Sequence, residues 1–87
     1  MESAASLLAR SQRYATVANA LAEVFDSLRE LDDSPHTREL RGRALTYEAT
    51  IKRWATVPPS EGQCLAMFEL VSDLHVSVME ADSLWRA

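Results

Sequence analysis

Residues 7–31 read LLARSQRYATVANALAEVFDSLREL, and a seven-residue hydrophobic repeat in this stretch decides the fold. The apolar residues occupy two heptad positions: Leu7, Tyr14, Val17, Leu21, Val24, Leu28 and Leu31. Such a repeat is typical of a helix whose side chains pack as knobs into holes on a neighbouring helix. The stretch therefore predicts an amphipathic helix over about residues 3–31.

A second helix is predicted over about residues 35–56. Ser34 is a suitable N-cap, and Pro35 fits the first helical position, where its missing N–H costs nothing. Apolar residues then recur at alternating spacings of four and three: Leu40, Ala44, Tyr47, Ile51 and Trp54. Two consecutive prolines, Pro58 and Pro59, end the segment because proline breaks the helical hydrogen-bond ladder.

A third helix is predicted over about residues 60–85. Ser60 and Gln63 have the spacing of a capping box, which marks a helix start. The apolar seam of this segment again follows the heptad: Cys64, Met67, Val71, Leu74, Val78, Ala81 and Trp85. With the flanking positions included, this stripe covers about 160° of the helix, more than one neighbouring helix would cover.

These patterns predict an all-α fold, a single domain over residues 1–87 that forms an antiparallel three-helix up-down-up bundle with heptad-like packing. The short connections place consecutive helices antiparallel. The middle helix is the shortest, so one end of the first and third helices is expected to project beyond it as a two-helix stretch.

Composition narrows the class of protein. The single Cys64 excludes an internal disulfide, and the acidic N-terminus Met1-Glu2-Ser3 does not resemble a signal peptide. No stretch reaches the ~20 apolar residues of a membrane span. We therefore expect a cytoplasmic protein without membrane contact. Eight Arg against one Lys, together with 13 Ala, indicate a bacterial, GC-rich genome.

Motifs for catalysis are absent. Two glycines cannot form a phosphate-binding loop, and no metalloprotease or nucleophile-elbow motif occurs. We therefore predict no enzyme activity, no catalytic residues, no cofactor and no metal site. His36 and Glu39 share an H-x-x-E spacing, but capping and helix-dipole effects explain it.

The wide apolar stripe of the third segment is the candidate functional surface. We predict that it binds a protein partner through Phe68, Val71, His75, Met79, Asp82 and Trp85. Methionine and aromatic residues suit adaptable interfaces. The predicted function is a non-enzymatic interaction module (an adaptor, regulator or chaperone-like subunit), with a homodimer or a different protein as partner. Whether His75 and Asp82 serve function or structure stays open.

Charge offers an alternative. The chain carries −4 in total, but residues 34–56 carry +3 between two acidic segments. The basic residues on the outer side of the second helix would be an anion-binding surface: Arg38, Arg41, Lys52 and Arg53. A nucleic-acid-associated regulator is therefore the second hypothesis, although the overall negative charge disfavours it.

Overall fold

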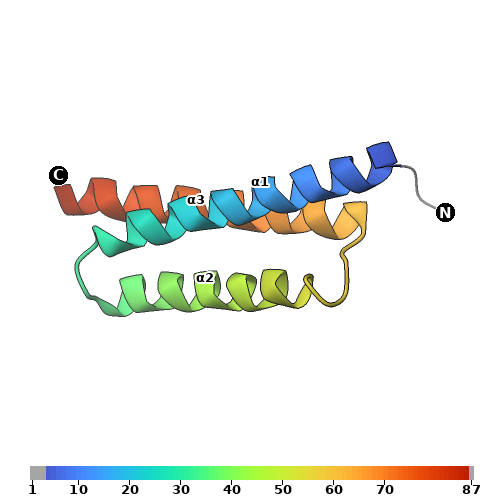
Figure 1. The fold of residues 1–87 in the computed structure, drawn as a ribbon. Helices are drawn as coiled ribbons and strands as arrows, with labels where there is room; N and C mark the ends of the chain where they lie inside the picture. The colour runs from blue at the N-terminus through green and yellow to red at the C-terminus, as the bar shows by residue number, and fades with distance from the viewer. Residues whose placement is uncertain (1–3, 87) are drawn as a thin grey trace.

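The structure is a computed structural model that describes the backbone of residues 4–86 and the side chains of residues 12–83. Three helices make up this part of the protein. They are α1 (Ala4–Arg29), α2 (Pro35–Arg53) and α3 (Glu61–Arg86), and each packs against the other two (Figure 1). Helix α2 runs antiparallel to its two neighbours, so α1 and α3 run parallel. The all-α three-helix bundle is therefore confirmed, and no strand occurs in residues 4–86.

The predicted helix starts are confirmed by their hydrogen bonds. The N–H of Thr37 donates to Oγ of Ser34 over 3.1 Å, which caps α2 with Pro35 in its first turn. At α3, the N–H of Gln63 donates to Oγ of Ser60 over 3.1 Å, and Oε1 of Gln63 accepts from the N–H of Ser60 over 2.8 Å. This reciprocal pair is a capping box.

The helix ends differ slightly from prediction. Helix α2 ends at Arg53, three residues early, because the chain tightens into i→i+3 hydrogen bonds such as Trp54 N–H to the Ile51 carbonyl at 3.1 Å. Helix α1 ends at Arg29 for the same reason, since Leu31 N–H donates to the Leu28 carbonyl at 3.2 Å. Tightening satisfies carbonyl groups that the last helical turn leaves without partners.

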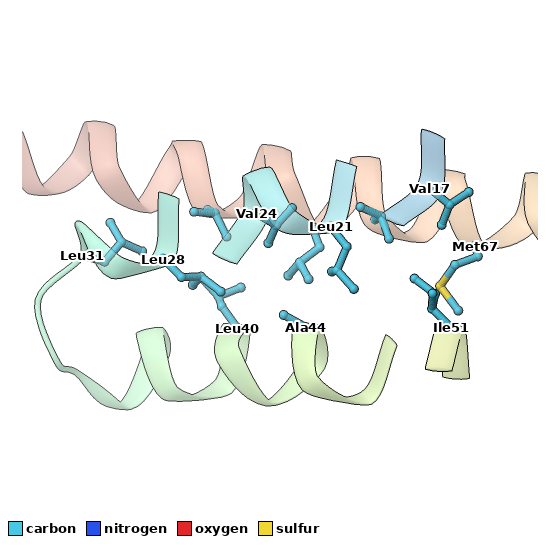
Figure 2. Close-up of a cluster of buried hydrophobic side chains, with 12 residues drawn as sticks. Val17, Leu21, Val24, Leu28, Leu31, Leu40, Ala44, Ile51 and Met67 are labelled. Atoms are coloured by element: carbon cyan, nitrogen blue, oxygen red, sulfur yellow. The ribbon is translucent and has the colours of Figure 1, made fainter. Parts of the chain in front are cut away.

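The predicted heptad seams form one hydrophobic core along the bundle axis (Figure 2). All three helices contribute to it: Val17, Leu21, Val24, Leu28, Leu31, Leu40, Ala44, Ile51, Met67, Val71, Leu74 and Val78. All members of this cluster are apolar, as heptad packing requires. Thr37 is a buried polar residue outside the cluster, and no buried polar atom of the described side chains lacks a hydrogen-bond partner.

The predicted two-helix stretch lies at the end of the bundle where α2 leads into α3, and α1 and α3 are also staggered (Figure 1). Arg13 lies nine residues after the start of α1 and pairs with Glu61, the first residue of α3, so α1 begins before α3 does. At the opposite end, Leu31 and Ala81 line one cavity, and α3 continues for five more residues. At the end where α2 leads into α3, both α1 and α3 extend beyond α2, and at the opposite end α3 extends beyond α1 (Figure 1). The projection of α3 beyond α1 follows from the stagger between these parallel helices.

An exposed glycine inside α2 offers a stabilising substitution. Nothing lies within 4 Å of the Cβ that Gly42 would gain, and its backbone has no positive φ. Gly42→Ala should therefore raise the free energy of unfolding by about 0.5–1 kcal/mol, because alanine loses less backbone entropy on folding. Urea unfolding followed by circular dichroism measures this change, and a less stable variant would contradict a continuous helix at this position.

Candidate functional site

Five large apolar side chains of α3 remain exposed in the described part of the helix, and all of them except Leu70 lie on one side. The exposed fractions of the four on this side are 58% for Leu65, 40% for Phe68, 54% for Val76 and 58% for Met79. With Ser72 between them, their spacing is three, four, four and three residues. At about 100° per residue they fall within about 80° of the helix surface. We call these four residues and Ser72 the α3 stripe, which is about 21 Å long.

The α3 stripe lies beside α1. Leu65 and Phe68 line an apolar cavity of about 180 Å³ together with Thr16 and Val17 of α1. At the other end, Val76 and Met79 share an open hollow with residues of α3 alone, Glu80 and Ser83. The stripe therefore runs along the face that α1 and α3 form, on the side turned away from α2.

Carboxylates border the stripe on both sides. On α1, Glu23 follows Thr16 by one heptad, so it shares the side of the helix on which Thr16 lies. On α3, Glu69 and Glu80 lie about 20–40° beyond the stripe on its other edge. These three glutamates are exposed. The result is an apolar line with one carboxylate on its α1 side and two on its other side.

One cation lies at the end of this face. A guanidinium nitrogen of Arg13 lies 3.4 Å from Oε1 of Glu61, and both side chains are well exposed. Since Arg13 already neutralises Glu61, it does not offset the carboxylates along the stripe. The face is therefore acidic over most of its length.

The residues that the sequence predicted to bind a partner differ in their exposure in the structure. Phe68 and Met79 belong to the α3 stripe, and His75 and Asp82 are half-buried between the stripe and the core. Val71 is a correction: its side chain is 0% exposed, inside the bundle. The side chain of Trp85 lies outside the described residues.

Leu65 and Val76 are functional candidates that the sequence reasoning missed. Their signal was a second heptad pattern on α3, offset from the core seam and interrupted by Ser72. The prediction from the sequence treated the whole apolar sector of α3 as one partner-binding surface. In the structure α3 packs against both α1 and α2, so most of that width is used inside the chain.

The basic residues of α2 are only partly available to an anion. Nε of Arg38 lies 3.3 Å from Oδ1 of Asp33, and Nζ of Lys52 lies 3.3 Å from Oε1 of Glu48. Within the described side chains, Arg41 and Arg53 make no ion pair. The predicted anion-binding surface is therefore reduced to these two guanidinium groups.

A groove between α1 and α2 adds to this mixed charge. It has a volume of about 440 Å³, an apolar floor that includes Phe25 and Ile51, and a rim with charges of both signs: Asp26, Arg29, Glu48 and Lys52. Arg29 pairs with Asp26 at 2.9 Å, so the rim is largely neutralised within the chain. The groove has no net charge to attract a phosphate backbone.

The described residues contain no sign of other chemistry. Cys64 is a free, buried thiol of the core region. No group of three or more His, Cys, Asp or Glu side chains between residues 12 and 83 is placed to hold a metal ion. None of the helices, over the residues described, has the length and apolar character needed to cross a membrane.

Comparisons with protein-family models, curated proteins and solved structures found no match to this chain.

Proposed function

We propose that this protein is a non-enzymatic interaction module that binds another protein through the face formed by α1 and α3. The observation that carries the proposal is the α3 stripe, in which Leu65, Phe68, Val76 and Met79 are 40–58% exposed in one line. Scattered surface hydrophobics are ordinary, but an ordered line of them marks an interaction surface.

The residue types of the stripe fit this role. Phe68 and Met79 supply the aromatic ring and the flexible thioether that are enriched at protein interfaces. The half-buried His75 and Asp82 lie at the inner edge of the stripe, where they add polar groups to a contact. The core beneath is one cluster of buried apolar side chains that all three helices contribute.

Affinity capture with matched surface variants tests the proposal. The baits are the wild-type protein, Val76→Glu and Leu45→Glu, since Val76 and Leu45 are similarly exposed at 54% and 51% but lie on α3 and α2. We expect a partner that both the wild-type and Leu45→Glu proteins retain and Val76→Glu loses, because a charge in a buried interface goes uncompensated. A partner set that survives Val76→Glu unchanged would contradict the proposal.

A nucleic-acid-associated role is the alternative, and the observation in its favour is that Arg41 and Arg53 of α2 make no ion pair among the described residues. Such a role requires DNA or RNA binding that weakens steeply with salt. Titration of a labelled duplex and a labelled single strand at low salt separates the two hypotheses. Binding that Arg41→Ala and Arg53→Ala both weaken would favour this alternative over the protein partner.

We propose a bacterial cytoplasm as the place of action. The support is compositional: eight Arg to one Lys, 13 Ala and one cysteine, with that cysteine held as a free thiol in the bundle. Free thiols persist in reducing compartments.

A further inference from the structure

We infer that the partner segment is a basic amphipathic helix, with a ridge of apolar side chains flanked on both sides by Lys or Arg. This inference rests on the proposed function and specifies the partner's chemistry. Three features of the α1–α3 face carry it: the shape of the stripe, the charge on its two sides, and its poor match to a second copy of this chain.

The shape of the stripe fits a helix. Leu65 to Met79 covers 15 residues, or about four helical turns. The stripe is one or two side chains wide, with hollows at both ends. A helix that presents apolar residues at i, i+3 or i+4, i+7 and i+11 offers a ridge of matching length and width.

The charge of the borders selects a basic helix. Residues that flank an apolar ridge on the partner would lie over Glu23 on one side and over Glu69 and Glu80 on the other. Opposite charges at such flanking positions set partner choice and orientation, as at the e and g positions of coiled coils. Acidic flanks on the partner would meet like charges along the whole contact.

A second copy of the chain matches the apolar part of the stripe but not its charge. A two-fold axis at Ser72 would place Leu65 opposite Met79 and Phe68 opposite Val76 of the other copy. The same axis would bring Glu69 of one copy toward Asp73 of the other, between two molecules that each carry −4. The basic helix α2 of a second copy offers Leu45 as its large exposed apolar residue, which makes no ridge. Charge complementarity therefore favours a different, basic partner.

Two labelled peptides of about 18 residues, long enough to cover the stripe, test the inference. Both carry leucine at the five ridge positions with the stripe's spacing of three, four, four and three, and alanine elsewhere. One has lysine at the flanking positions, and its twin has glutamate there. Fluorescence anisotropy measures binding of each peptide to the full chain. We expect the lysine peptide to bind at least about tenfold more tightly, and to weaken as salt rises from about 0.05 to about 0.5 M.

A matched pair of charge reversals locates the contact. Glu80 lines the hollow with Val76 and Met79, whereas Glu39 is exposed on α2. Glu80→Lys should weaken the lysine peptide by about threefold to tenfold. Glu39→Lys changes the net charge by the same amount and should leave the affinity within about twofold.

Several results would overturn the inference. Equal binding of the two peptides would show that the borders do not select charge, and no binding of either at about millimolar concentration would exclude a helical ridge. Sedimentation that shows a dimer, lost in Val76→Glu, would identify a second copy as the occupant. In each of these cases, a cellular partner that binds the wild type but not Val76→Glu would still support the proposed function. Failure of that capture experiment removes the proposed function as well.

Discussion

Val71→Glu is expected to leave the bundle largely unfolded, whereas Val76→Glu is expected to fold like the wild type. Both residues are valines of α3, but Val71 is 0% exposed and Val76 is 54% exposed. A carboxylate at position 71 would enter a core without any polar group to pair with it, at a cost of at least about 4 kcal/mol. A domain of this size has a total stability of about 4–13 kcal/mol.

Circular dichroism at 222 nm during urea unfolding measures this difference. Val76→Glu should shift the free energy of unfolding by no more than about 0.5 kcal/mol, as for other surface substitutions. The result that would contradict the structure is the reverse order, with Val71→Glu folded and Val76→Glu unfolded. It would mean that α3 is rotated about its axis and that the α3 stripe is the core.

Leu74→Ala is the second large effect, with an expected loss of about 2–5 kcal/mol. Leu74 is 0% exposed at the level where α3 meets both other helices, so its truncation removes buried contacts and leaves a cavity. The matched control is Leu70→Ala, one turn earlier on the same helix, where the leucine is 43% exposed. We expect that control to cost less than about 1 kcal/mol.

Thermal unfolding gives the same comparison in degrees. A loss of about 3 kcal/mol in a domain of this size lowers the melting temperature by about 12–24 °C. Similar losses for the two leucine variants would show that α3 is not held in one fixed orientation. Such a result would remove the distinction between core and stripe on which the proposed surface depends.

The fold could be predicted from the sequence because each of the three apolar repeats lies between a predicted helix start and a predicted helix end. Val17, Leu21, Val24, Leu28 and Leu31 are buried in the order that the repeat of the first segment predicts. The capping residues Ser34 and Ser60 start helices where expected, because their hydroxyl groups accept hydrogen bonds from N–H groups three residues later. These signals are local, so one sequence is enough to identify them.

The relative position of α1 and α3 could not be predicted from local signals. These helices are parallel and are not joined directly, so their stagger depends on which side chains interlock across the bundle. In the structure, Arg13 of α1 contacts Glu61 of α3, and Tyr14 of α1 contacts Trp54 at the end of α2 with ring centroids 6.5 Å apart. Helix lengths alone predicted that one end of α1 and α3 projects beyond α2, but they carry no information on the offset between α1 and α3.

The candidate surface was predicted only in part, for the same reason. Periodicity places Phe68, Val71 and Met79 in one wide apolar sector, but it does not say where the neighbouring helices end and solvent begins. The packing of α1 against α3 decides that boundary. It buries Val71 and leaves Leu65 and Val76 exposed beside Phe68 and Met79.

Site-specific photo-crosslinking in the source cell is the most direct test of the central claim, that the α3 stripe is the docking surface. A photoreactive amino acid is introduced at Met79 of α3 or at Leu45 of α2, which are 58% and 51% exposed. The account predicts a covalent adduct with a partner protein from position 79 and none from position 45. An adduct from position 45 with none from position 79 would contradict it.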